Sequence, residues 1–328
     1  MHHSQTTASL FVAILSATVL VGCQQPSTSD VDQTEEGVVR LGTVEAVDTV
    51  SRAVAPKDRP LVIEGGRGTV VLAGADQESV ELEFIRRGRG ETTEDARDVL
   101  EDVTIEESGT EQTYTFSLET NAPAYAAVDV RGTVPRDAEL RINRSMGPIA
   151  VTGVKGPITV SHEHGPVRVR EAGAPVEIET KNGDVEVGLW SVPAGATVKA
   201  RTVNGDVSSY FPPNASLEVS AETSVGVIRT KGLSWTDQQF MPRDAGGKYT
   251  AQLGAGSATV NLRTKNGSVL IQAADTTTQT NPQPDTLSVP PSDTTVTMPA
   301  SRDTAEAERD TASQMPPVDR DTAGTPGS

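Results

Sequence analysis

Aromatic side chains are scarce in this chain, and cysteine occurs once. Phe, Trp and Tyr make up 3% of the 328 residues, so the core has to be built from Val, Ile, Leu and Ala, which suits β-strands. The single cysteine, Cys23, allows no disulfide within the chain, so stability must come from packing and hydrogen bonds. Basic residues are also few, and the net charge is −17. Because nucleic-acid recognition needs clustered Lys and Arg, we expect no nucleic-acid partner.

Motifs of common catalytic sites are missing as well. The sequence holds no Gly-x-Ser-x-Gly elbow, no P-loop and no glycine-rich dinucleotide motif between a strand and a helix. Of the four histidines, His2 and His3 stand at the N-terminus, in the predicted signal peptide. The sequence therefore predicts a protein that is not an enzyme and that holds no cofactor.

What the chain has in abundance is one short pattern that returns between Ala138 and Ile271. Alternating apolar and polar residues lead to a glycine, after which the alternation resumes. The copies begin at Leu140, Ile158, Val176, Val198, Leu217 and Val260. The first four copies are separated by 18, 18 and 22 residues, and the copy at Leu217 is degenerate. Self-similarity at such a period is typical of a repeat architecture.

The pattern predicts an all-β fold in which the copies stack. Period-two alternation places Val176 and Ile178 on one face of a strand and Glu177 on the other. One copy alone has nothing to cover its apolar face, whereas stacked copies bury that face in a continuous core. Prolines recur every nine residues from Pro148 to Pro175, and proline suits a corner better than the middle of a sheet. We therefore predict a β-solenoid with two short strands and two corners in each copy.

The turns of the pattern leave a second geometry open. The breaks in the three most regular copies are formed by Asn182 and Gly183, Asn204 and Gly205, and Asn266 and Gly267. Asn-Gly is also the strongest short-range signal for a two-residue hairpin, so an antiparallel β-meander or sandwich is the alternative. The Gly-Pro corners of the looser copies favour stacked coils, because the residue before proline is held in an extended conformation.

Composition divides the chain into four parts. Residues 1–22 are predicted as a signal peptide, residues 23–60 as a flexible tether, residues 61–272 as the β-strand-repeat domain and residues 273–328 as a disordered tail. The tail is rich in Thr, Pro, Ser and Asp and has too few apolar residues to build a core.

Three further segments carry structural expectations. Val38 to Val50 is a candidate strand inside the tether. Glu91 to Glu101 predicts a short helix, because Thr92 or Thr93 can cap its start and acidic residues follow in the first turn. Leu233 to Tyr249 is irregular, and we expect it to loop out or to cover the edge of one coil.

The N-terminus indicates the compartment. An apolar run from Ala8 to Val21 is typical of the hydrophobic region of a signal peptide, and it ends in Leu-Val-Gly before Cys23. This segment resembles a bacterial lipoprotein signal, although its first residues contain no Lys or Arg. The resemblance implies cleavage before Cys23 and acylation of that residue, for instance by palmitate, so the membrane becomes a partner and the cell envelope the location. Gln24 resembles the sorting residue for the outer membrane in bacteria with two membranes.

Two pairs of side chains are candidates for chemistry. Asp184 and Asp206 hold equivalent positions in successive copies, so stacking would bring them within about 5 Å, close enough to share a proton, bind a cation or act on a glycan. The alternative is ordinary turn chemistry after Asn-Gly. His162 and His164 would share one face of a strand, as a metal site needs, but no third ligand is evident, so polar corner residues are the simpler interpretation. We predict no metal site and keep these four residues as candidates.

The recurring Thr-x-Asn-Gly-x-Val motif resembles the bacterial putative-adhesin family of β-strand-repeat domains of unknown function. The resemblance extends from Leu61 to Gln272 and includes the Gly-Thr-Val-Val-Leu segment at 68–72. It implies a right-handed, β-helix-like domain on the cell envelope, and it carries over no catalytic residue. The expected function is adhesion, binding or scaffolding, with an unknown envelope protein or glycan as partner. The alternative is a polysaccharide-binding or polysaccharide-cleaving solenoid that uses Asp184 and Asp206.

Overall fold

The computed structural model describes residues 44–56, 59–173 and 175–274. The chain divides into two compact units, residues 1–277 and 278–328, and all described residues belong to the first. Cys23, the predicted signal peptide and nearly all of the predicted tail lie outside the described residues. Among the described residues, no helix has the length and apolar character needed to cross a membrane.

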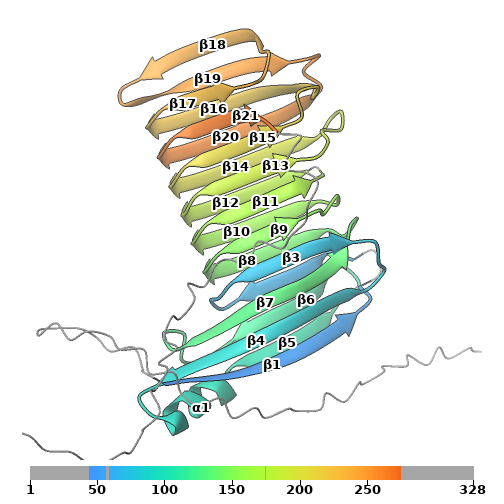
Figure 1. Cartoon of the computed structure of the whole chain (residues 1–328), viewed down its shortest axis with the longest axis vertical. Helices are drawn as coiled ribbons and strands as arrows, with labels where there is room; N and C mark the ends of the chain where they lie inside the picture. The colour runs from blue at the N-terminus through green and yellow to red at the C-terminus, as the bar shows by residue number, and fades with distance from the viewer. Residues whose placement is uncertain (1–43, 57–58, 174, 275–328) are drawn as a thin grey trace, which may run out of the picture. The chain divides into compact units, whose positions relative to one another are not determined.

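The described residues form mostly β-strands, which confirms the all-β class, and the strands make two mixed sheets (Figure 1). The ten-stranded sheet, sheet A, contains in spatial order β1 (Val44–Val54), β4 (Val80–Gly90), β7 (Ala126–Pro135), β3 (Val70–Ala75), β9 (Ile149–Thr152), β11 (Val167–Ala172), β13 (Val185–Leu189), β15 (Val207–Phe211), β21 (Val269–Ala273) and β17 (Ile228–Lys231). The eleven-stranded sheet, sheet B, contains β18 (Thr236–Arg243), β19 (Gly246–Leu253), β16 (Leu217–Val225), β20 (Ala258–Asn266), β14 (Thr197–Asn204), β12 (Val176–Asn182), β10 (Ile158–His164), β8 (Leu140–Met146), β2 (Leu61–Gly65), β6 (Tyr114–Glu119) and β5 (Thr104–Gly109).

Each copy of the repeat gives one strand to sheet B and, after a corner, one strand to sheet A. Strands of successive copies then pair in parallel: β8 with β10, β10 with β12, and β12 with β14 in sheet B, and likewise β9, β11, β13 and β15 in sheet A. The Asn-Gly breaks are therefore corners between the two sheets, and the copies do not pair as antiparallel hairpins.

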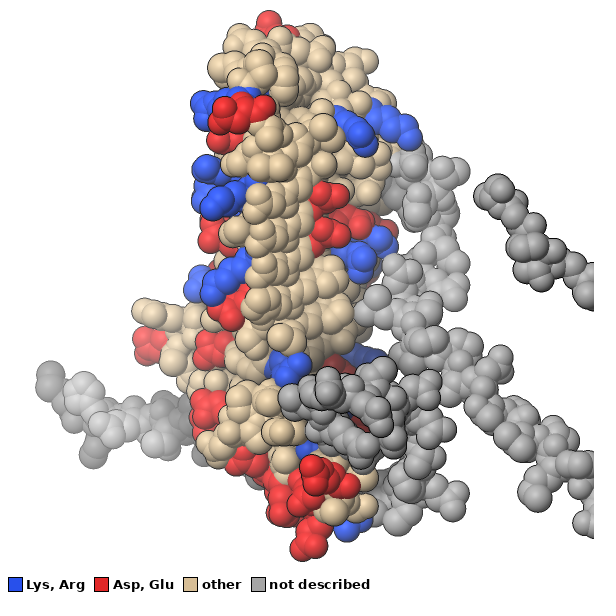
Figure 2. Space-filling model, turned by 90° about the vertical axis from the view of Figure 1, so that its left-hand side faces the viewer, with Lys and Arg blue, Asp and Glu red and all other residues tan. Residues whose placement is uncertain are grey.

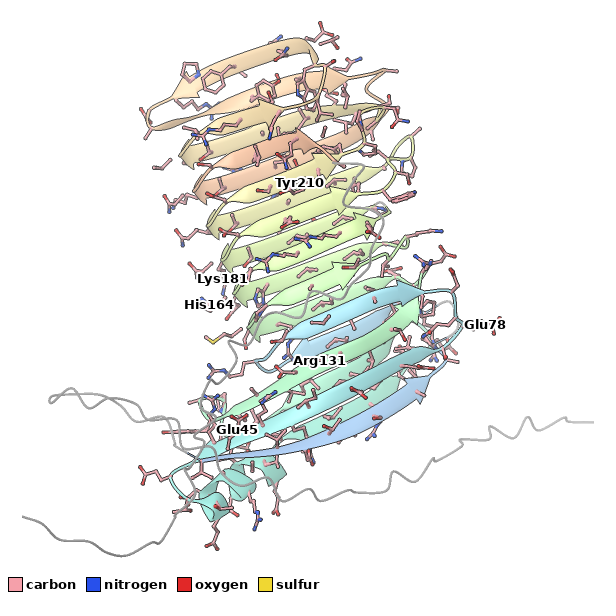
Figure 3. The ribbon with its side chains drawn as sticks, viewed as in Figure 1. Glu45, Glu78, Arg131, His164, Lys181 and Tyr210 are labelled. Carbon is pink, nitrogen blue, oxygen red and sulfur yellow. The ribbon has the colours of Figure 1, made fainter. Side chains whose placement is uncertain are left out.

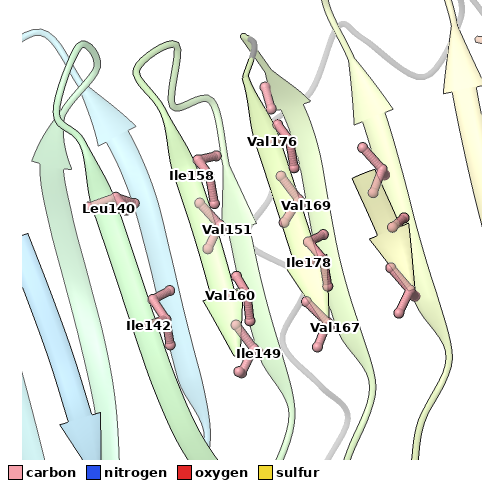
Figure 4. Close-up of a cluster of buried hydrophobic side chains, with 14 of the residues drawn as sticks. Leu140, Ile142, Ile149, Val151, Ile158, Val160, Val167, Val169, Val176 and Ile178 are labelled. Atoms are coloured by element: carbon pink, nitrogen blue, oxygen red, sulfur yellow. The ribbon is translucent and has the colours of Figure 1, made fainter. Parts of the chain in front are cut away.

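Parallel pairing in register places equivalent side chains above one another. Val176 faces Val198, and Val198 faces Val260, and these three residues are exposed by 1%, 0% and 0%. Valines at equivalent positions of sheet A, such as Val167 and Val185, are buried as completely. Figure 4 shows Val167 within this cluster of buried side chains. Full burial of such a side chain contributes about 1.5–3 kcal/mol, so each coil is stabilised mainly through its neighbours.

The last copy of the repeat does not lie last in the stack. β20 pairs with β14 on one side and with β16 on the other, and β21 lies in the same way between β15 and β17. The chain therefore passes the position of the fifth coil, builds the sixth, and then returns to fill the fifth.

The irregular segment Leu233–Tyr249 covers the edge of sheet B, one of the two arrangements expected for it. β19 pairs antiparallel with β16, and β18 pairs antiparallel with β19. All side chains of β18 are exposed, and the strand contains Pro242 and an irregular register between Thr236 and Gln239. Proline and bulges are typical of edge strands that resist further pairing.

At the N-terminal end, antiparallel strands replace the coils. β1 pairs with β4, β4 pairs with β7, and β5 pairs with β6. β1 (Val44–Val54) lies inside the range 23–60 that the sequence predicts as a tether, so strand structure begins before the predicted boundary at Leu61. β1 overlaps the candidate strand Val38–Val50, whose first residues lie outside the described ones. Asp48 lies on its half-buried face, where its Oδ1 accepts a hydrogen bond of 2.7 Å from Nε of Arg86.

The one helix among the described residues, α1 (Thr93–Glu101), confirms the prediction for this segment. Thr92 is the N-cap: its Oγ1 accepts from the Asp95 N–H at 3.1 Å, and the Asp95 carboxylate accepts from the Thr92 N–H at 3.0 Å. This reciprocal capping box fixes the start of the helix. Ala96 is fully buried against β4, where the glycines Gly88 and Gly90 leave room for the helix backbone.

The corner glycines have no room for a side chain. Gly183, Gly205 and Gly267 have φ values of 150°, 144° and 150°, which disfavour other residues. A Cβ at Gly205 would lie 2.3 Å from the carbonyl oxygen of Gly183 in the neighbouring coil, and a Cβ at Gly267 would lie 2.0 Å from that of Gly205. The corners can therefore stack at strand spacing only if they are made of glycine.

We expect Gly205→Ala to destabilise the protein by about 2–5 kcal/mol, because the new methyl group meets both a strained φ and a backbone carbonyl. Urea unfolding of the purified protein measures the change in the free energy of unfolding. Gly188→Ala is the control, since a Cβ at Gly188 would have its nearest neighbour at 3.8 Å, and we expect a change below about 1 kcal/mol. Equal effects of the two substitutions would contradict this account of the corners.

Candidate functional site

The asparagines of the corners form a ladder across the coils. Nδ2 of Asn266 donates to Oδ1 of Asn204 at 2.7 Å, and Nδ2 of Asn204 donates to Oδ1 of Asn182 at 2.7 Å. Nδ2 of Asn182 lies 3.1 Å from Nδ1 of His164, so the ladder extends to one further coil. Figure 3 labels His164 on this edge of the stack. The predicted turn residues thus join neighbouring coils in addition to turning the chain.

Asp184 and Asp206 lie on the other side of the same corners, and both bind backbone. Oδ1 of Asp184 accepts from the Asp206 N–H at 2.8 Å, and Oδ1 of Asp206 accepts from the Ser268 N–H at 2.7 Å. Each carboxylate therefore caps an N–H of the next coil. A catalytic or cation-binding role for the two residues stays a prediction. Among the residues that the structure describes, no three His, Cys, Asp or Glu side chains form a group that could hold a metal ion.

The two candidate imidazoles do not share a face, and this part of the sequence prediction is wrong. His162 is 3% exposed and points inward, with Nδ1 2.9 Å from the carbonyl oxygen of Arg144. His164 is exposed, because β10 ends there and the chain turns at Gly165. Burial lowers the pKa of His162, and hydrogen bonds to backbone groups such as that of Arg144 offset the decrease only in part. The buried imidazole is therefore neutral at neutral pH.

A buried arginine that the sequence analysis did not single out lies beside His162. Arg144 is 1% exposed, and its guanidinium donates to the carbonyl oxygens of Gly65 at 2.6 Å and Val128 at 2.8 Å. Burial lowers its pKa to about 10, while the carboxylate of Asp129 acts in the opposite direction. The side chain is therefore charged at neutral pH. The available signal was its inward position in the alternation Leu140-Arg-Ile-Asn-Arg144.

Arg144 and His162 begin an inward column of polar residues next to the corners. The register continues it through Thr180, Thr202, Thr264 and Thr223. Three of the threonines donate from Oγ1 to the corner glycine of a neighbouring coil: Thr202 to Gly183 at 2.9 Å, Thr264 to Gly205 at 2.8 Å and Thr223 to Gly267 at 2.7 Å. The column supplies hydrogen bonds to carbonyl groups that the corners would otherwise leave buried and unpaired.

A second polar network holds the antiparallel end together. Asp129 accepts from the Thr69 N–H at 2.8 Å and from Nε of Arg87 at 2.9 Å, and Arg87 also bonds Glu45 at 2.9 Å. The network joins β1, β4 and β7. Because all its members have partners within the domain, we interpret it as structural.

The outer face of sheet B carries ion pairs between neighbouring coils. Lys181 pairs with Glu163, and Arg201 lies 3.3 Å from Glu179. Lysine and arginine alternate with acids along one side of the stack (Figure 2). Such exposed pairs are each worth at most about 1 kcal/mol, so they stabilise the domain little and remain accessible to a charged ligand.

A hollow of about 520 Å³ lies near the end of α1. Asp102 and Asn121 line it, and Asp102 accepts hydrogen bonds of 2.6 Å from both the N–H and Nδ2 of Asn121, which hold the pKa of that carboxyl below its usual value. Arg67, also in the lining, donates to the carbonyl oxygens of Pro123 and Ala124. These groups already have partners, and they fix a loop between β6 and β7.

We expect Arg144→Ala to destabilise the protein by about 3 kcal/mol, because it leaves the carbonyl groups of Gly65 and Val128 buried without a donor. Arg141→Ala is the control on the same strand: its side chain is 50% exposed, and we expect a change below about 0.5 kcal/mol. Urea unfolding at neutral pH measures both. A loss for Arg144→Ala as small as that for Arg141→Ala would show that the buried guanidinium is dispensable.

Stability should also depend on pH through His162. Its folded-state pKa is below the unfolded value of about 6.5, so the unfolded chain binds more protons as the pH falls below that value, and stability decreases. We expect His162→Thr, which restores the residue type of the next coils, to flatten the decrease in the free energy of unfolding between about pH 7 and about pH 5. The exposed variant His164→Thr should retain the wild-type slope. An unchanged slope in His162→Thr would assign the acid sensitivity to other groups.

Comparison with known proteins gives no family assignment, since no family model and no curated protein matches the chain. Solved structures that align with it include a putative cell adhesion protein from Clostridium sporogenes, 13% identical, with a TM-score of 0.42, covering 70% of this chain and 100% of that one. A putative adhesin from Bacteroides fragilis is 13% identical, with a TM-score of 0.33 and coverage of 69% and 97%. A putative lipid binding protein from Parabacteroides distasonis is 8% identical, with a TM-score of 0.24 and coverage of 70% and 97%.

Proposed function

We propose that this chain is a lipid-anchored protein of the cell envelope whose repeat domain binds or scaffolds without catalysis. In this proposal the domain is a right-handed β-solenoid of the putative-adhesin type, and its long outer faces serve adhesion to an envelope protein or a glycan. The observation that carries the proposal is the parallel, in-register pairing of the strands from β2 to β16 across sheet B.

This pairing supports a binding function because it repeats surface groups at a fixed spacing. Outward side chains of equivalent positions follow one another at the strand spacing of about 4.8 Å. A partner with repeating groups can therefore be bound at several points at once, and many weak contacts add up to a useful affinity. A stack of this kind also holds its outer residues rigidly, which reduces the entropy lost on binding.

The proposed anchor is the acylated Cys23, which lies outside the described residues. The support comes from the sequence: the cysteine directly follows an apolar run, and it is the only one in the chain. Several acyl chains would hold the protein stably, at about 0.8 kcal/mol for each buried CH₂ group. Attachment to the outer membrane, suggested by Gln24, applies if the host has two membranes.

The anchor is tested by Cys23→Ser in the native host. We expect the wild-type protein in the membrane fraction, labelled by an alkyne analogue of palmitate, and we expect the variant to lose the label, because it has no other thiol. Ser27→Ala is the control at a nearby position and should behave as wild type. Labelling that survives the loss of Cys23 would contradict the anchor.

The binding function is tested by crosslinking in the intact envelope and by a glycan array. We expect a defined protein or glycan partner for the wild type. The variant Asp184→Asn with Asp206→Asn keeps the shape of both side chains, and we expect it to retain binding. Loss of glycan binding or of glycan cleavage in that variant, with unchanged stability, would favour the alternative function that uses these two residues. No partner in either experiment would contradict the binding function.

A further inference from the structure

The outer face of sheet B contains a hollow with a charge opposite to that of the whole protein. Its volume is about 620 Å³, and it lies over β12, β14 and β20 and reaches β10 and β16 at its two ends. Four cationic side chains line it, Lys181, Arg201, Arg263 and Lys265, and among the lining residues only Glu179 is acidic. The chain as a whole carries a net charge of −17. A local excess of positive charge on such a protein points to an anionic ligand.

The register of the strands arranges the four cations in two rows. Arg201 and Arg263 are direct partners on the adjacent strands β14 and β20. Lys181 and Lys265 hold equivalent positions on β12 and β20, with Val203 between them on β14. The arginine row therefore has a spacing of about 5 Å and the lysine row of about 10 Å. A ligand with anionic groups at regular intervals fits this arrangement better than a single small anion does.

Three of the four cations form exposed ion pairs within the protein, and Lys181 pairs with Glu163. Arg263 lies 3.9 Å from Glu222 and is 61% exposed, and Arg201 lies 3.3 Å from Glu179 and is 50% exposed. Lys265 has no ion-pair partner among the described residues. Because such exposed pairs contribute little to stability, a ligand carboxylate or sulfate can replace them at small cost. The two arginines can bind such groups in bidentate fashion, and the lysines add point charges.

We propose that this hollow binds an acidic polysaccharide, with successive carboxylate or sulfate groups on Arg263 and Arg201 and on the lysine row. The proposal rests on the binding function above and names its face and its ligand class. A polysaccharide fits better than a nucleic acid, because no Phe, Trp or Tyr lines the hollow to stack on bases and the imidazole of His162 is buried. The overall negative charge also opposes the dense phosphates of a nucleic acid.

The test measures binding of the purified protein to immobilised heparin and polygalacturonate, with neutral dextran as the uncharged probe. We expect binding to both acidic polymers, none to dextran, and a clear weakening when salt rises from about 0.05 M to about 0.15 M. The double variant Arg263→Ala with Lys265→Ala should bind at least about tenfold more weakly.

The matched control is Arg141→Ala with Arg168→Ala, which removes the same charge from exposed positions outside the hollow. We expect it to bind within about twofold of wild type, which would exclude an effect of net charge alone. Thermal unfolding checks that all variants are folded, and the exposure of the four substituted side chains predicts unchanged midpoints.

Three outcomes would overturn the proposal: wild-type binding by the double variant of the hollow, equal losses in the control variant, or no binding of either acidic polymer by the wild type. A single-stranded oligonucleotide that binds more tightly than the polysaccharides, and through the same two residues, would reassign the hollow to nucleic acid. Each of these failures leaves the proposed envelope function standing if the Cys23 label and the crosslinked partner are found.

Discussion

Parallel pairing of backbone in register, at about 4.8 Å between strands, is the constraint on which the other features of the repeats depend. Once Val176 faces Val198, each remaining position of a coil must also lie above its equivalent. A residue type that suits one coil then suits the next, and the interior becomes a set of columns. Apolar columns form the core, polar columns border the corners, and charged columns cover the outside of sheet B.

The corners show how strict this constraint is. Two neighbouring corners at strand spacing lie so close that their backbones are in contact. The glycines therefore cannot be replaced unless one of the coils moves. The carbonyl groups held there also need donors, and threonine provides them from inside. Near the antiparallel end, His162 and Arg144 occupy the positions that threonines hold in the other coils. Arg144 is long enough to reach β2 and β7, where the regular corner no longer exists.

The features that could be predicted from the sequence are those that repeat from coil to coil or depend on neighbouring residues. The inward side of Val176, the corner role of Asn204 and the capping of the helix by Thr92 are local or periodic features, and periodicity is visible in a single chain. The remaining features depend on contacts between distant segments. The extent of β1 depends on its pairing with β4, and the burial of the Arg144 charge depends on β2 and β7, which surround it. The basic hollow likewise depends on the pairing of β14 with β20, which the order of the copies in the sequence does not indicate.

The displaced position of the last coil affects how the protein is made. In a chain that becomes available from its N-terminus, the edge of β14 stays unpaired until β20 is present, while β16, β19 and β18 can pair with one another but not yet with the stack. The edge strands β14 and β15 thus remain unpaired until residue 273 is available. At this stage they can pair with the strands of other chains and cause aggregation. A stop codon before β20 would remove the strands that separate two coils, and the damage would reach well beyond the residues that were lost.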